Sequence, residues 1–212
     1  MKLLGFEETK KILEQYKIPF SETELVKSKK QALKSAENIG YPIVLKGFSV
    51  KVLHKTERGL VKFKIDEGKR LARVVDEIMK SSKGIKIEGV LIQKMEQGIE
   101  LVCGMKRDAS FGPVLMFGLG GIFVEVLKDV SFAISPITKE EALNMIEEVR
   151  GYKILKGYRD QLSVNISSIA DILVNLSKLS DEHSEIKEID LNPIFATGKN
   201  IKVADAKFLI SS

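Results

Sequence analysis

Apolar positions recur along this chain with two periods, one of three to four residues and one of two, which are typical of helices and strands respectively. The longer period predicts helices over residues 6–17, from Ser28 to Gly40, from Asp66 onward, from Thr138 to Arg150 and over residues 167–180. Short apolar runs and alternation predict strands at 43–46, 61–65, 89–95, 99–106, 112–117 and 122–134, and two more close the chain. Because strands outnumber helices and the order is mixed, we expect an α+β fold with antiparallel sheets.

Start and stop signals support two of these helices. Ser28 is followed by Gln31, and Thr138 is followed by Glu141. This is the spacing of a capping box, in which a hydroxyl and a carboxylate or amide satisfy free backbone N–H groups. Gly40 then ends the helix that Ser28 opens.

Composition narrows the class of protein. With 212 residues, the chain is long enough for one or two domains and a sizeable core. Its net charge of +5 is spread among interleaved acids, so we expect no nucleic-acid partner. The single cysteine, Cys103, excludes an intramolecular disulfide and a cysteine-based zinc cluster, and we expect it to be buried. No apolar run approaches about 18 residues, so we expect a cytoplasmic protein with no membrane contact.

The two closing strands carry the first candidate chemistry. Glu188 to Pro193 and Val203 to Lys207 are apolar runs with acids or amides at their ends. If the strands are neighbours, Asn192 and Asp205 come together and offer the hard oxygen ligands that Mg²⁺ takes beside substrate phosphates. The alternative is an ordinary strand edge with solvated carboxylates.

A lysine and a histidine are further candidates. Lys46 follows the apolar run Ile43 to Leu45, and it could neutralise phosphate oxygens or simply be a solvated strand end. His54 lies in the loop expected between Gly47 and Gly59, where it could carry a phosphoryl group or make ordinary hydrogen bonds. The other histidine, His183, sits in an acidic turn, and we expect it to be structural or solvated.

A glycine-rich stretch lies between the runs at 112–117 and 122–134. Its glycines, Gly118, Gly120 and Gly121, could let backbone N–H groups approach an anion, or could simply form a tight hairpin. The stretch is not a Walker loop, because no Gly-Lys-Ser/Thr follows it, and it is not a Rossmann fingerprint, because we expect a strand and not a helix next. Glu125 would then be an acid inside an apolar strand, needing a partner if buried.

Together these stretches resemble the nucleotide-binding β subunit of the ADP-forming acyl-CoA synthetases and, more distantly, the ATP-grasp part of succinyl-CoA synthetase β. The resemblance covers essentially the whole chain. The stretches that carry it are Tyr41 to Lys46, His54 to Thr56, Phe111 to Glu125, Lys128 to Phe132, and Glu188 to Pro193.

The resemblance implies an ATP-grasp fold, with a smaller lid-like subdomain at residues 21–90 and a larger one formed by residues 1–20 with 91–212. It also implies a role for each matching residue. The phosphates would be bound by Lys46 and by the loop of Gly118, Gly120 and Gly121. Adenine would be read by Gln93, Lys94 and Met95, the ribose by Glu100, and Mg²⁺ by Asn192 and Asp205. Asp190 would face a phosphohistidine, and His54 would relay phosphate between two distant sites.

The implied reaction converts acyl-CoA, ADP and phosphate into the free acid, CoA and ATP. The CoA-binding domain would belong to a partner α subunit, in a hetero-oligomer of two α and two β chains. Two positions depart from the family pattern, since Leu60 stands where a second glycine is common and Ala133 where an arginine is common. Rival hypotheses are a stand-alone ATP-grasp ligase that forms an acyl phosphate directly and a nucleotide-sensing subunit that transfers no phosphate.

Overall fold

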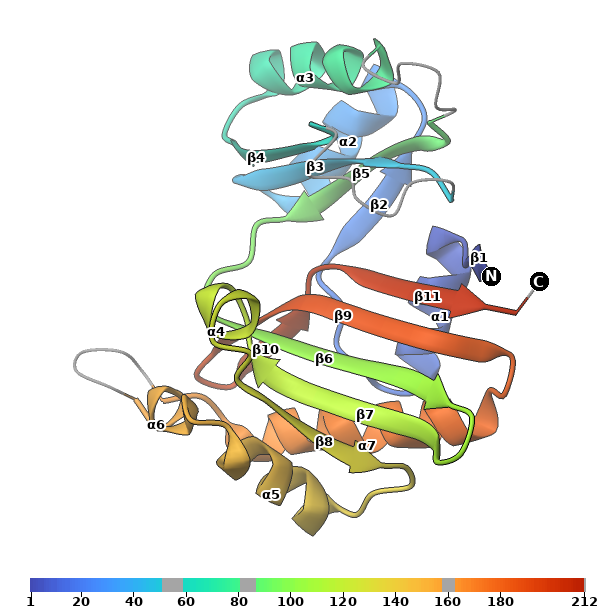
Figure 1. The fold of residues 1–212 in the computed structure, drawn as a ribbon. Coiled ribbons are helices and arrows are strands. Elements are labelled where there is room, and N and C mark those ends of the chain that lie inside the picture. The colour runs from blue at the N-terminus through green and yellow to red at the C-terminus, as the bar shows by residue number, and fades with distance from the viewer. Residues whose placement is uncertain (51–58, 81–86, 158–162, 212) are drawn as a thin grey trace. The chain divides into compact units, whose positions relative to one another are not determined.

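The computed structural model describes residues 1–50, 59–80, 87–157 and 163–211, and the chain divides into two compact units. The larger unit is Met1–Phe20 with Glu96–Ser212, and the smaller is Ser21–Met95 (Figure 1). The second boundary lies beyond the residue 90 expected from the sequence. Strand β5 (Gly89–Lys94) pairs with two strands of the smaller unit and therefore belongs to it.

The smaller unit is an antiparallel sheet with helices on it. In its described residues the strand order is β2 (Thr23–Val26), β5, β3 (Ile43–Phe48), β4 (Val61–Ile65). Helices α2 (Lys29–Ile39) and α3 (Gly68–Lys80) share one apolar core with the sheet. The Ser28 side chain accepts the N–H of Gln31 as expected, while the Gln31 side chain accepts the N–H of Lys27. In a capping box the Gln31 side chain would accept the N–H of Ser28, so this second bond is shifted by one residue to Lys27.

Strand β4 departs from the simple alternation of its sequence. Val61, Phe63 and Ile65 would share one face of a regular strand, but Ile65 is fully buried whereas Phe63 is 58% exposed. The pairing of β4 with β3 shifts register along this stretch, and Lys64 has a φ of +51°. An irregularity of this kind turns the side chains before and after it to opposite faces, so Ile65 is buried whereas Phe63 lies in solvent.

The larger unit is built on a second antiparallel sheet. Among its described residues seven strands take part, in the order β1 (Lys2–Leu3), β11 (Ala206–Ile210), β9 (Ile186–Thr197), β6 (Ile99–Asp108), β7 (Gly112–Leu119), β8 (Val130–Ile134), with β10 (Asn200–Val203) also paired to β9. The helices are α1 (Phe6–Gln15), α4 (Ile122–Glu125), α5 (Lys139–Glu148), α6 (Tyr152–Leu155) and α7 (Ile166–Glu182). The prediction of an α+β fold with antiparallel sheets is confirmed.

Helices α5 and α7 cover one face of this sheet (Figure 1). Phe117, Leu173, Ile189 and Phe208 are buried between them and the strands, and so is Cys103, as the sequence predicted. Because strand side chains alternate, the residues between these buried positions point to the opposite face. We call this opposite face the open face.

Two sequence-based expectations about the larger unit are wrong. Residues 122–134 form the short helix α4 followed by β8 and not one long strand, and Glu125, the last residue of α4, is exposed and so needs no buried partner. Gly118 pairs with Val130 and Leu119 still pairs with Leu101, so the chain leaves the sheet only after Leu119, as an excursion without a strand partner. The chain end likewise holds three strands where two were expected, since β10 and β11 both pair with β9. None of the helices in the described ranges has the length and apolarity needed to span a membrane.

Candidate functional site

Asn192 and Asp205 are brought together at the turn between β10 and β11. The backbone N–H of Asn192 donates to the carbonyl oxygen of Asp205 at 3.0 Å. The Asn192 side chain is exposed and that of Asp205 is half-buried. The described residues contain no group of three or more His, Cys, Asp or Glu able to hold a metal by themselves. The pair nevertheless fits Mg²⁺, which commonly binds one or two protein oxygens and completes its shell with phosphates and water.

Asp190 lies one open-face position from Asn192 on the same strand. It pairs in register with Lys207 of β11, and the Lys207 ammonium donates to the Asp190 carboxylate at 3.2 Å. Both side chains remain partly exposed, at 26% for Lys207 and 33% for Asp190. Asp190 is therefore held in place as a carboxylate while part of it stays accessible to a ligand.

Glu100 and the glycine-rich stretch meet at one end of β6. The N–H of Gly120 donates to the carbonyl oxygen of Glu100 at 2.7 Å. A Cβ at Gly120 would lie 2.9 Å from the Glu100 Cβ, and Gly121 has a φ of +58°, so both positions favour glycine. Gly118 differs, because it lies inside β7 and not in the loop. Glu100 itself is exposed on β6 beside this loop.

Asp129 anchors the other end of the α4 excursion, and the sequence analysis did not single it out. Its side chain is 6% exposed and accepts the backbone N–H groups of Arg150 and Gly151, each at 2.8 Å. Its own N–H donates to the carbonyl oxygen of Phe123 at 3.0 Å. The available signal in the sequence was an acid directly beside an apolar strand, because a carboxylate that is buried there needs hydrogen-bond partners. These bonds hold the segment that carries Gly120 and Gly121.

The remaining nucleotide candidates lie in the smaller unit. Lys46 is 8% exposed and lies within β3, opposite Leu91, so it does not end the strand as the sequence suggested. Gln93 is buried, and its amide donates to the Thr23 hydroxyl at 2.8 Å. The Lys94 side chain is exposed, and the N–H of Met95 donates to the Pro42 carbonyl at 3.2 Å.

Of the two histidines, the structure describes only His183. His54 lies outside the described residues. His183 ends α7, contacts the Tyr16 ring edge-on, and its Nδ1 lies 2.8 Å from the Glu185 carboxylate. The hydrogen bond to His183 is the main cause that lowers the pKa of Glu185. The expectation that His183 is structural fits these contacts.

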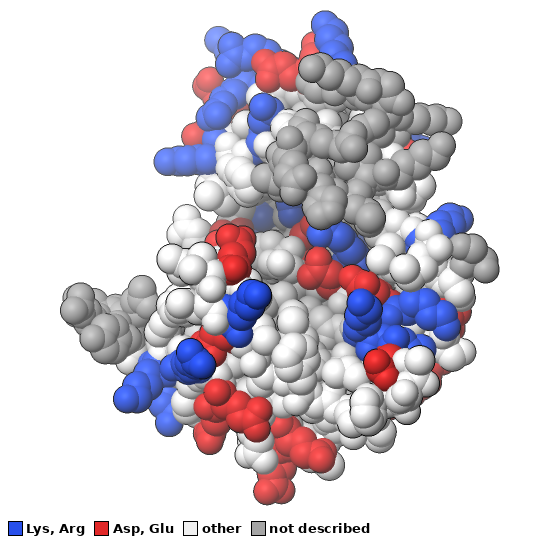
Figure 2. Space-filling model, viewed as in Figure 1, with Lys and Arg blue, Asp and Glu red and all other residues white. Residues whose placement is uncertain are grey.

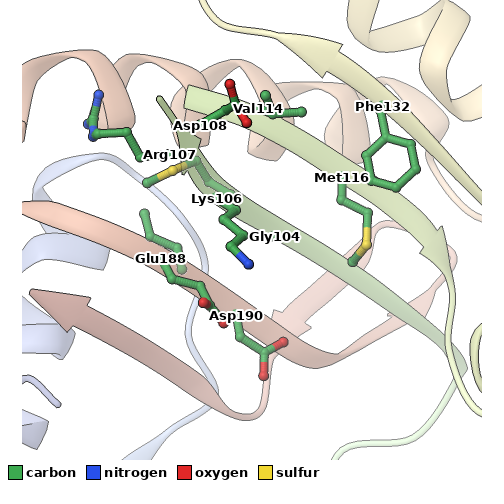
Figure 3. A pocket seen from close by; sticks show the side chains of 11 residues that line it. Gly104, Lys106, Arg107, Asp108, Val114, Met116, Phe132, Glu188 and Asp190 are labelled. Atoms are coloured by element: carbon green, nitrogen blue, oxygen red, sulfur yellow. The ribbon is translucent and has the colours of Figure 1, made fainter. Parts of the chain in front are cut away.

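A depression of about 430 Å³ adjoins Asp190 on the open face, and we call it the sheet pocket. Figure 3 shows Met116 and Phe132 on one side of it and Glu188 and Asp190 on the other, with Lys106 between them. The sequence does not reveal this pocket, because its walls combine β6, β7 and β8 with β9, which lies more than 50 residues further along the chain.

The chain is similar to several known proteins. A model of the ATP-grasp domain matches residues 1–210. The β subunit of ADP-forming acetate–CoA ligase I from Pyrococcus furiosus is 44% identical over 208 residues, which cover 96% of this chain and 90% of that protein. ADP-forming acetate–CoA ligase I from Archaeoglobus fulgidus is 45% identical over 204 residues, which cover 94% of this chain but 30% of that longer protein.

A solved structure is also similar. Acetyl-coenzyme A synthetase 1 of Ca. Korarchaeum cryptofilum matches with a TM-score of 0.87 and 37% identity, over 99% of this chain and 93% of that one. That structure is described as a complex with coenzyme A and Mg-AMPPCP, with its phosphohistidine segment pointing towards the nucleotide-binding site.

Proposed function

The chain belongs to the ATP-grasp family and, within it, to the β subunits of ADP-forming acetate–CoA ligases, and from this premise we propose that it exchanges a phosphoryl group between a phosphohistidine and Mg²⁺-bound ADP. The observation that carries the proposal is the arrangement of polar groups around the end of β6. Glu100 and the glycine loop lie there, and Asn192 and Asp205 lie on the neighbouring strand and turn. Groups suited to a sugar, a phosphate chain and a metal thus share one region of one unit.

Each group has a distinct task in this proposal. Glu100 accepts hydrogen bonds from the ribose hydroxyls, and the N–H groups around Gly120 and Gly121 approach the phosphates. When bound at Asn192 and Asp205, Mg²⁺ would neutralise charge on the phosphoryl oxygens. Phosphoryl transfer needs little covalent help from the protein, so positioning and charge supply most of the catalysis.

Lys46 and the segment from Gln93 to Met95, which belong to the smaller unit, are also assigned to the nucleotide in the proposal. Lys46 is buried on a rigid strand, which suits a cation that must hold phosphate oxygens at a fixed position. The segment from Gln93 to Met95 lies at the end of β5 in the same sheet and would supply polar groups for adenine. We assign these roles from the family resemblance and from the burial of Lys46 and Gln93.

The CoA chemistry is assigned to a partner α subunit. Relatives occur both as a separate β subunit and as a chain of which this protein matches 30%. The rest of that longer chain is the expected counterpart of the partner. We propose a hetero-oligomer of two α and two β chains.

The test is a pulse with ATP labelled on its γ-phosphate, applied to the complex of this chain with its partner. Protein-bound label that is lost in acid and stable in base identifies phosphohistidine. His54→Ala should abolish net ATP formation and leave Mg·ADP binding largely intact, because the relay is lost while the nucleotide site remains. Absence of any acid-labile label would favour the rival ligase or the sensor, and unchanged turnover in His54→Ala would remove the relay.

A further inference from the structure

Two rows of polar side chains cross from β9 to β11 on the open face of the larger sheet. Asn192 and Asp205 form one row, and Asp190 and Lys207 form the next. Residues two apart along a strand lie on the same face, about 7 Å from each other. The Lys207 ammonium therefore lies one row from the pair of residues proposed to bind Mg²⁺.

Lys207 is a cation that keeps part of its hydrogen-bonding capacity. Its ammonium donates to the Asp190 carboxylate at 3.2 Å, and the side chain is 26% exposed. An ammonium has three N–H donors, and Asp190 is its only hydrogen-bond partner among the residues that the structure describes. Figure 2 shows acidic and basic side chains next to one another over β9 and β11, whereas the middle of the sheet, over β6 and β7, is largely uncharged. Charged side chains thus gather on the strands that carry the proposed metal pair.

The ion pair is not needed to hold its two strands together. Strands β9 and β11 are already paired along their backbones over Ala206–Ile210. A partly exposed ion pair contributes little to the free energy of folding, because water screens both charges. The ion pair of Lys139 with Asp171 differs, since it links α5 to α7 on the helix side of the sheet. A task in ligand binding or transfer therefore accounts for the position of Lys207 better than a gain in stability.

The charge of Asp190 is an obstacle to the proposed transfer. Asp190 is assigned there to face a phosphohistidine, and the transferring phosphoryl group carries negative charge on its three equatorial oxygens. A carboxylate close to such a group repels it, and the repulsion is stronger where water is partly excluded. A cation in contact with the carboxylate offsets this repulsion. Lys207 is in that position.

We propose that Lys207 is a positioning residue of the phosphoryl transfer, an inference that rests on the proposed function. One N–H of its ammonium holds the Asp190 carboxylate in place, and its charge lets that carboxylate lie close to the phosphoryl group of phosphorylated His54. In the transfer, the P–N bond breaks and a P–O bond forms to a terminal oxygen of ADP. The electron pair of the P–N bond stays on the imidazole, which leaves neutral because its other nitrogen keeps its proton. Lys207 gives up no proton.

The experiment uses the complex of this chain with its partner subunit, phosphorylated from acetyl-CoA and phosphate before Mg·ADP is added. Lys207→Met should lower the rate of ATP formation at saturating Mg·ADP at least about tenfold, because Asp190 then repels the phosphoryl group. The KM for Mg·ADP should stay within about threefold of the wild type, since both proposed metal ligands are intact. Lys207→Gln, which keeps a donor without the charge, should behave like Lys207→Met, whereas Lys207→Arg should recover most of the rate.

A second substitution shows whether Lys207 acts through Asp190. In a chain that carries Lys207→Met, the further change Asp190→Asn removes the uncompensated charge, while the amide oxygen can still accept a hydrogen bond. The double variant should therefore form ATP no more slowly than Lys207→Met alone. If the two losses multiply instead, the two residues act independently and the inference is wrong.

The matched control is Lys139→Met, which breaks a lysine–aspartate ion pair on the helix side of the same unit. This variant should keep the wild-type rate of ATP formation. The thermal midpoints of Lys207→Met and Lys139→Met should both lie close to that of the wild type, because each variant loses only a partly exposed ion pair.

Three further results would overturn the inference while leaving the proposed function in place. They are an unchanged rate in Lys207→Met, a raised KM for Mg·ADP with an unchanged rate, and an equal loss of rate in Lys139→Met. The second would assign Lys207 to the nucleotide, and the third would make both ion pairs structural. The proposed function fails on a different result, which is a wild-type complex that acquires no acid-labile label from ATP.

Discussion

At the scale of single residues, chemistry is decided by what surrounds each side chain. Cys103 is fully buried, and burial raises the pKa of its thiol to about 12, so it stays an inert apolar residue. Asp205 differs, because its side chain is only half-buried and lies beside Asn192 at a strand turn. An accessible carboxylate next to an amide keeps its capacity to bind a cation.

Asp205→Ala tests this assignment. Removing the carboxylate should weaken binding of Mg·ADP by about tenfold or more, and binding of metal-free ADP much less, because one of two protein ligands is lost. Calorimetric titrations with and without Mg²⁺ measure both values. Equal Mg²⁺ dependence in the variant and the wild type would count against Asp205 as a ligand.

At the scale of elements, the α4 excursion shows how a short segment is held without a strand partner. Ile122, Val126 and Leu127 are all more than half exposed, so the excursion has little core of its own. The buried Asp129 carboxylate ties its base to the backbone of Arg150 and Gly151. The position of the glycine loop therefore depends on a few hydrogen bonds.

Asp129→Asn is the test, because the amide can accept one of the two N–H bonds but presents a donor to the other. Nucleotide affinity should fall, and stability should drop by about 1–3 kcal/mol as one buried N–H loses its partner. Asp108→Asn is the matched control. Asp108 also accepts two N–H groups, from Ser110 and Phe111, but at the exposed β6–β7 turn.

The control variant Asp108→Asn should leave the Kd for nucleotide unchanged. Comparison of nucleotide Kd and thermal midpoint in the two variants separates a local role from general destabilisation. If Asp129→Asn lowers the midpoint but binds nucleotide like the wild type, the carboxylate is structural and does not position the loop.

At the scale of the whole molecule, both units are built on antiparallel sheets in their described residues. Dinucleotide-like cofactors such as CoA are commonly bound at the edge of a parallel doubly wound sheet, which neither described sheet resembles. We therefore keep CoA binding with the partner subunit in the proposed division of labour.

The chain alone should therefore form no ATP from acetyl-CoA, ADP, phosphate and Mg²⁺, and activity should appear when the partner subunit is added. A coupled assay for ATP, run with each protein alone and with the mixture, measures this directly. Substantial ATP formed by this chain without its partner would show that the CoA chemistry does not require the partner subunit.

The sequence by itself determined the features that depend on neighbours along the chain. The Thr138–Glu141 capping box, the buried Cys103 and the meeting of Asn192 with Asp205 were expected from short-range patterns, although the chain end forms three strands and not the expected two. Capping and alternation act over a few residues, so their physical causes are visible in the sequence.

Only the tertiary structure decided the rest. Whether residues 122–134 pair as a strand depends on the available partners, and the pairs Gly118–Val130 and Leu119–Leu101 leave the residues from 122 to 129 outside the sheet. The exposure of Phe63 follows from an irregular register with β3, and the sheet pocket joins side chains of β6, β7, β8 and β9. These outcomes arise from contacts between distant segments, which packing selects and local propensity does not encode.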